Sequence, residues 1–109
     1  MRAGNVMYVA GQVAKNAQGT LVAPRDTAAQ AAVIYANLDA ILREAGAEPS
    51  YVVKVTTYLA EDADATAAAE ARLAFFGQHR PPHTGIVVGL PEGVQLEVEV
   101  VVIFPDVAS

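Results

Sequence analysis

The sequence contains no cysteine and no tryptophan. Without cysteine, disulfide bridges, thiol catalysis and thiolate-bound metal sites are all excluded. Cations are also scarce: seven Lys and Arg face twelve Asp and Glu, and they form no cluster. Because nucleic-acid binding needs several grouped cations, DNA and RNA are not expected partners. No apolar run approaches the roughly 18 residues of a membrane-spanning helix and no signal-peptide pattern opens the chain, so we expect a soluble cytoplasmic protein.

The apolar residues that are present are mostly small. Alanine accounts for 22 positions and valine for 16, against three phenylalanines and four tyrosines. Apolar residues make up 53% of the 109 positions, which excludes disorder and predicts one domain over residues 1–109. A chain of this length cannot bury so much valine within one copy. We therefore expect part of its surface to contact another subunit.

Hydrophobic periodicity predicts the order β-β-α-β-α-β-β. The expected elements are a strand at 5–10, a hairpin over 12–22, a helix from 26 or 27 to 46, a strand at 52–59, a helix at 64–77, a strand at 84–89 and a strand at 94–104. This pattern indicates an α+β fold in which two helices cover one face of a mixed sheet. The other face is exposed to water or covered by a partner, and the valine excess favours a partner.

Few polar residues lie where strands end or turn. Gln12 follows Gly11, and the pair His83-Thr84 follows two prolines. His83 is either a site residue, able to bind a carboxylate or move a proton near neutral pH, or a loop histidine satisfied by a carbonyl or water. Glu97 and Glu99 point to one side of the last strand, either as an acid–base pair or as a solvated face. No residue spacing predicts a metal site.

The chain resembles the Rid (YjgF) family of reactive intermediate deaminases from about residue 5 to residue 104. The resemblance is carried by short stretches in the family's order and spacing. They are Tyr-Val-Ala-Gly-Gln (8–12), Ala-Ala-Gln (28–30), Asn-Leu-Asp-Ala-Ile-Leu-Arg-Glu-Ala-Gly (37–46), Val-Val-Lys-Val-Thr-Thr-Tyr-Leu (52–59), Phe-Phe (75–76), Leu-Pro (90–91) and Leu-Glu-Val-Glu-Val (96–100).

The resemblance implies a chorismate-mutase-like fold and a homotrimer with ligand clefts between subunits. It also implies hydrolysis of 2-imino acids to 2-keto acids and ammonia, with no cofactor or metal. Glu97 matches the family glutamate that positions the attacking water, and Gly11 matches backbone that lines the cleft. With Gln12, Thr84 and the N–H of Gly85 as further binding groups, a small carboxylate or imino acid is the expected ligand.

The chain departs from the family where the substrate is bound. The family's carboxylate-binding arginine is replaced by His83, its serine before Gly-Gln by Ala10 and its asparagine on the second helix by Ala69. The family's N-terminal segment is also short here. Guanidinium grips a carboxylate through two hydrogen bonds, whereas a neutral imidazole offers one donor. We therefore expect the imine deaminase activity to be weak or altered, with His83 contacting the carboxylate or acting as an acid.

Two other functions remain open from the sequence. One is a trimeric protein that binds a small metabolite without turning it over. The other is a structural or chaperone-like surface. Endoribonuclease activity, also claimed in the family, has no basic track to support it in this acidic chain.

Overall fold

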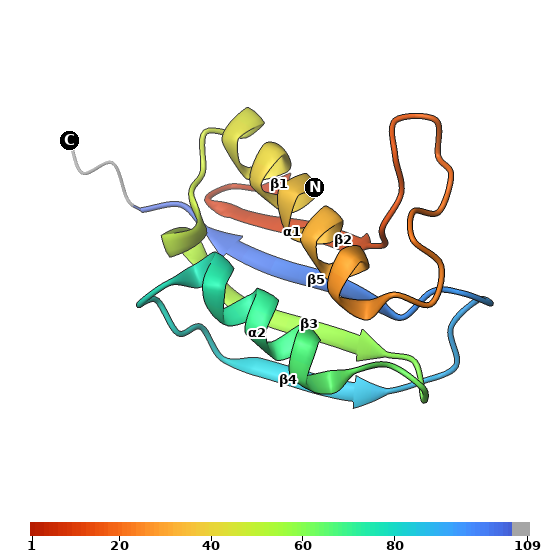
Figure 1. The fold of residues 1–109 in the computed structure, drawn as a ribbon. Coiled ribbons are helices and arrows are strands. Elements are labelled where there is room, and N and C mark those ends of the chain that lie inside the picture. Colours follow the sequence, from red (N-terminus) through yellow and green to blue (C-terminus); the bar gives the residue numbers. More distant parts are fainter. Residues whose placement is uncertain (106–109) are drawn as a thin grey trace.

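The computed structural model describes residues 1–105, in which two helices pack on one face of a five-stranded sheet (Figure 1). The elements are β1 (Arg2–Ala3), β2 (Val6–Gln12), α1 (Thr27–Glu44), a 3-10 turn (Pro49–Tyr51), β3 (Val52–Leu59), α2 (Ala65–Phe76), β4 (His83–Val87) and β5 (Leu96–Ile103). The predicted α+β arrangement with both helices on one face is confirmed.

The strands are ordered β1-β2-β5-β3-β4. The final strand, β5, therefore lies at the centre between β2 and β3, antiparallel to both. The edge strand β4 runs parallel to β3, so the connection between them must cross over the sheet, and α2 makes that crossing (Figure 1). The crossover places α2 over the same edge of the sheet as β4.

Aspartates begin both helices. The Asp26 side chain accepts a hydrogen bond from the N–H of Ala29, and the Asp64 side chain accepts one from Ala67. Each bond satisfies an N–H group that has no partner within its helix. After α1, the chain turns at Gly46 with φ of 77°, a conformation that glycine adopts without a Cβ clash.

The alternation in β5 separates the two faces of the sheet. Leu96, Val98, Val100 and Val102 are buried beneath the helices, while the residues between them are half-buried or exposed. On that open face, away from the helices, three large apolar side chains are exposed: Tyr8 (54%), Ile86 (47%) and Ile103 (41%). Within residues 1–105, nothing covers them.

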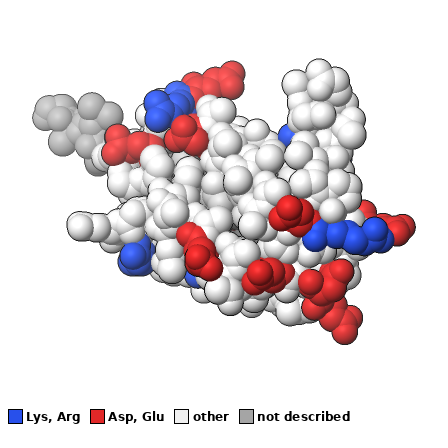
Figure 2. Space-filling model, viewed as in Figure 1, with Lys and Arg blue, Asp and Glu red and all other residues white. Residues whose placement is uncertain are grey.

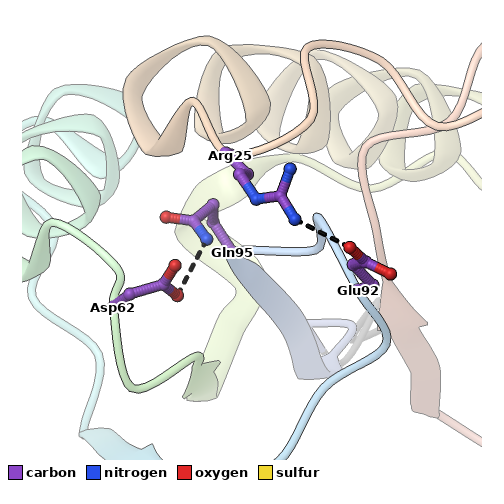
Figure 3. A network of polar contacts seen from close by, with 4 residues as sticks. All are labelled: Arg25, Asp62, Glu92 and Gln95. Atoms are coloured by element: carbon purple, nitrogen blue, oxygen red, sulfur yellow. Dashed lines mark hydrogen bonds and ion pairs between the residues drawn. The ribbon is translucent and has the colours of Figure 1, made fainter.

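A polar network joins the start of β5 to both helix N-termini. The Gln95 side chain accepts a hydrogen bond from Thr27 Oγ1 at 2.9 Å. It also donates one to Asp62 Oδ1 at 3.1 Å (Figure 3). Beside it, Arg25 bridges to Glu92 at 2.8 Å, but both side chains are largely exposed. An exposed ion pair contributes at most about 1 kcal/mol, so the buried amide contacts matter more for stability.

The predicted hairpin over 12–22 is present as a short antiparallel ladder. Lys15 forms a bridge with Leu21, the N–H of Val22 donates to the carbonyl of Ala14 at 2.7 Å, and the N–H of Asn16 donates to the carbonyl of Thr20 at 3.0 Å. The strand that pairs with β2 on its outer side is the short β1, which was not predicted. Two residues are too few to show an alternating pattern, which explains why β1 escaped detection.

Candidate functional site

On the open face, Glu97 lies directly against the backbone of Gly11. A Cβ atom added to Gly11 would sit 2.2 Å from Glu97 Oε2 and 2.7 Å from its Cδ, so the lack of a side chain lets the carboxylate approach this closely. A bulge in β2 accompanies the contact: Val9 pairs with Val100 but Gln12 pairs with Val98, so two residues oppose one. The structure therefore brings Gly11 and Glu97 together.

The two glutamates of β5 have different environments. Tyr58 donates its hydroxyl to Glu99 Oε1 at 2.5 Å. This hydrogen bond to Glu99, followed by burial and the charges of Glu99 and Glu97, raises the pKa of Tyr58 above its ordinary value. Within residues 1–105, the Glu97 carboxylate accepts no hydrogen bond. Both oxygens of Glu97 are thus available to a water molecule, whereas one oxygen of Glu99 is already bound by Tyr58.

The remaining open-face residue from the predicted set is Thr84. It lies next to Thr56 on the neighbouring strand and accepts a hydrogen bond from Lys54 Nζ at 2.5 Å. The Nε2 of Gln12 donates to the carbonyl of Ala10 on its own strand at 3.0 Å.

His83 lies on the other side of the sheet. It pairs with Val55, a core residue, and its Nε2 shares a 2.9 Å hydrogen bond with Oγ1 of the buried Thr57. Gly85 is next to it, since an added Cβ there would lie 3.3 Å from His83 Cε1. The imidazole therefore faces the underside of α2 and not the open face that carries Glu97.

A small cavity of about 40 Å³ lies beside His83, between β3, β4 and the N-terminal half of α2. Its lining consists of Thr57, Leu59, Ala65, Ala68, Ala69, Arg72 and His83. Burial, together with the charges of Arg72 and Lys54, lowers the pKa of His83 below 6.5.

The predicted residues thus fall into two half-sites on opposite faces of one sheet. The open-face half-site contains Glu97 and Gly11, and the helix-side half-site contains His83 and Gly85. A single chain cannot bring Glu97 and His83 to one ligand, because the sheet separates them. Only two copies, with the open face of one against the β4 edge of the other, could do so.

Comparison with known proteins identifies the family. A family model described as Endoribonuclease L-PSP matches residues 1–104. This chain belongs to that family. Among curated relatives, a RutC family protein of Pyrococcus abyssi is 33% identical over 102 residues, which cover 93% of this chain and 80% of the relative. A 2-iminobutanoate/2-iminopropanoate deaminase of Escherichia coli K12 is 31% identical over 104 residues, covering 92% and 80% of the two chains.

Solved structures agree. A Rid family protein from Yersinia pestis superposes with a TM-score of 0.79 at 36% identity, covering 93% of this chain and 80% of the other. RidA from an Antarctic Psychrobacter gives a TM-score of 0.82 at 26% identity, covering 95% and 85%. The predicted membership of the Rid family is confirmed.

The surface of this L-PSP family member has no basic track on its helix-bearing face. Figure 2 shows that face as mostly uncharged, with acidic side chains in several places and the few basic ones separated from each other. None of the helices within residues 1–105 is long and apolar enough to cross a membrane.

A larger cavity, about 630 Å³, lies at the far end of the sheet near Arg2, Tyr51 and Phe104. The Arg2 guanidinium lies 3.7 Å over the Phe104 ring, so its positive charge is already engaged there. No residue of either half-site lines this cavity. Size alone therefore does not locate the candidate site.

Sequence reasoning missed three polar neighbours of the site: Tyr58, Thr57 and Arg72. Tyr58 and Thr57 lie in a strand whose many β-branched residues are typical of a buried core strand, so there was no sequence-based reason to expect polar roles for them. Arg72 looked like an ordinary surface charge of the second helix. One sequence signal was available: Arg72 lies three residues after Ala69, the position of the family's asparagine, and residues three apart on a helix share a face.

Proposed function

We propose that this L-PSP family protein hydrolyses 2-imino acids to 2-keto acids and ammonia, with Glu97 positioning the attacking water. The observation that carries the proposal is the Glu97 carboxylate, held against the Gly11 backbone with no protein donor of its own within residues 1–105. Relatives named 2-iminobutanoate/2-iminopropanoate deaminase support the choice of substrate class.

The chemistry requires only water and a proton carrier. A water bound to Glu97 attacks C2 of the imine, and its proton passes through the carboxylate to the nitrogen. The C–O bond forms as the C=N double bond becomes single. The hydroxyl proton of the resulting tetrahedral intermediate then passes through the carboxylate to the nitrogen. The C–N bond breaks as the C=O double bond forms, which releases ammonia and leaves the 2-keto acid. No redox change occurs, so the reaction consumes only water.

The proposal includes a homotrimer in which each site lies at a seam. The open-face half-site of one subunit, with Glu97 and Gly11, would meet the helix-side half-site of the next, with His83 and Gly85. The exposed Tyr8, Ile86 and Ile103 on the open face support such an assembly, because exposed apolar patches of this kind commonly mark interfaces. Light scattering should give three times the mass of one chain, and Ile103→Lys should yield monomers. A monomeric wild-type protein would refute the assembly.

Imine turnover tests the catalytic role. A pyridoxal-phosphate-dependent dehydratase generates 2-iminobutanoate from threonine in the cuvette, and the release of 2-oxobutanoate is followed with and without this protein. The wild type should accelerate release above the spontaneous rate. Glu97→Gln should lose about 10²- to 10⁴-fold of that acceleration, the usual contribution of a general acid–base group.

Glu99→Gln provides the matched control. It makes the same chemical change two residues away on the same face, at a carboxylate already bound by Tyr58. It should keep most of the activity. A wild type that gives no acceleration would reject the proposed function, and a larger loss in Glu99→Gln than in Glu97→Gln would reject the assignment of Glu97.

A further inference from the structure

The cavity beneath α2 contains a cation that the proposed mechanism does not use. Arg72 lines it together with Thr57 and His83, and the small side chain of Ala69, three residues earlier on α2, belongs to the same lining. The cavity lies at the β4 edge of the sheet, where Ala65 on its rim is exposed, so a small molecule has a route to it.

Arg72 has no anionic partner within residues 1–105. The two ion pairs there join Arg25 to Glu92 and Arg43 to Asp39. Arg80, the other arginine near His83 in sequence, donates to the carbonyls of Gly77 and His79. An arginine that is partly buried beside a cavity and has no carboxylate partner within residues 1–105 is unusual, because burial of an unpaired charge is unfavourable.

The lining of the cavity contains one permanently charged side chain, that of Arg72, and no acidic one. The charges that act on His83 are those of Arg72 and Lys54, and no carboxylate is among them. The Arg72 charge also acts on Tyr35: burial raises the pKa of that phenol to about 12, and the guanidinium partly offsets the rise. A cavity lined by a guanidinium-bearing residue and by no acidic side chain is suited to an anionic ligand.

The size of the cavity limits the ligand group. About 40 Å³ accommodates one or two water-sized groups, which fits a carboxylate but not a whole metabolite. The rest of the ligand must extend past the rim toward solvent or a neighbouring subunit. His83 has one nitrogen bound to Thr57, and its other ring nitrogen makes no hydrogen bond within residues 1–105.

We propose that Arg72 binds the carboxylate of a small 2-keto or 2-imino acid in this cavity, with His83 and Thr57 as neighbouring hydrogen-bonding groups. The guanidinium fork can hold both carboxylate oxygens, which a single imidazole cannot do. The assignment of the ligand as an imino acid rests on the proposed function. The carboxylate site itself rests on the cavity and on Arg72. A weak or altered deaminase activity was expected from the sequence because His83 replaces the family's carboxylate-binding arginine. That expectation applies only if no other cation binds the carboxylate.

Pyruvate binding tests the inference without requiring turnover. Pyruvate is titrated into the wild-type protein while the imidazole ¹H–¹³C signals of His83 are followed by NMR, and uncharged pyruvamide serves as the comparison ligand. Pyruvate should produce saturable shifts and pyruvamide should not. Arg72→Gln should raise the pyruvate Kd about 10- to 150-fold, the effect of losing a charged hydrogen bond.

Two further variants separate charge from space. Arg80→Gln removes a nearby cation that does not line the cavity, and it should leave the Kd unchanged. Ala69→Leu keeps every charge but fills the cavity with a residue that favours helix, and it should abolish binding. Circular dichroism and thermal melting establish that each variant is folded.

Three results would overturn the inference: no saturable pyruvate binding by the wild type, an unchanged Kd in Arg72→Gln, or an equal loss in Arg80→Gln. The outcome is separable from the proposed function. Arg72-dependent pyruvate binding in a protein without deaminase activity would uphold the site and reject the function. Deaminase activity in a protein whose pyruvate affinity is unchanged by Arg72→Gln would uphold the function and reject the Arg72 site.

Discussion

The contact between Gly11 and Glu97 makes Gly11→Ala a sharp probe of the open-face half-site. The new methyl carbon would lie 2.2 Å from Glu97 Oε2, whereas ordinary van der Waals contact begins near 3.4 Å. The carboxylate must therefore retreat by about 1 Å or more. A misplacement of about 1 Å at a reacting group can cost about 10²-fold in rate, so we expect kcat/KM for 2-iminobutanoate hydrolysis to fall by about 100-fold.

Stability should change little in the same variant. Gly11 does not have a positive φ, and the end of the Glu97 side chain can move aside at low cost. Replacing glycine by alanine at a compatible position also reduces the entropy of the unfolded chain, which stabilises by about 0.4–1 kcal/mol. Urea denaturation should therefore give a midpoint close to that of the wild type.

Gly89→Ala is the matched control, because an added Cβ at Gly89 has no neighbour within 4 Å and its φ is not positive. It should keep full activity. Wild-type activity in Gly11→Ala, together with a crystal structure showing the Glu97 carboxylate displaced, would refute the argument that its position controls the reaction.

Two further predictions concern the core network and His83. Gln30 donates to the carbonyls of Ala23 (3.0 Å) and Gly93 (2.8 Å) and accepts from the N–H of Gln95 (2.8 Å). Gln30→Met keeps the length of the side chain but leaves these backbone groups unpaired, so urea denaturation should show a loss of about 3–5 kcal/mol; a loss below about 1 kcal/mol would contradict the network's importance. For His83, an NMR pH titration should give a pKa below 6.5, with Arg72→Gln moving it upward. Since the unfolded chain then binds more protons than the folded one, this histidine's contribution to stability is complete above about pH 6.5 and declines as the pH falls toward the folded-state pKa. A pKa at or above 6.5 would contradict the described environment.

The fold was predictable where the hydrophobic pattern is long. The apolar stripe of the first helix ends at Gly46, and the alternation of the last strand from Leu96 to Ile103 separates a buried face from an open one. Over such lengths only one type of secondary structure places all the apolar positions on the buried side, so few alternative structures are possible. The hairpin over 12–22 forms only a short ladder, because its apolar positions are few and its turn residues satisfy their hydrogen bonds locally.

The candidate site was only partly predictable, because a site depends on which face each strand presents. The spacing of Glu97 within β5 fixes its face, since Leu96 and Val98 on either side must be buried. His83 begins a short edge strand after two prolines, and its face is set by parallel pairing with Val55, which no local pattern shows. Arg72 lines the same cavity as His83 only because α2 crosses over the paired strands β3 and β4. The contribution of α2 to the site is therefore a consequence of tertiary structure.

Because the two half-sites lie on opposite faces of one sheet, mixing subunits of two variants can distinguish a site shared between subunits from a site within one chain. If each site combines Glu97 of one subunit with Arg72 of the next, then Glu97→Gln and Arg72→Gln are each impaired alone but complement each other in mixed trimers. After unfolding and refolding together in equal amounts, about a quarter of the seams would receive both intact halves, and about that fraction of wild-type activity should return. Mixing Glu97→Gln with Gly11→Ala, whose defects lie in the same half-site, should restore nothing. Equal recovery in the two mixtures, or none in either, would mean that the two half-sites do not cooperate across a seam.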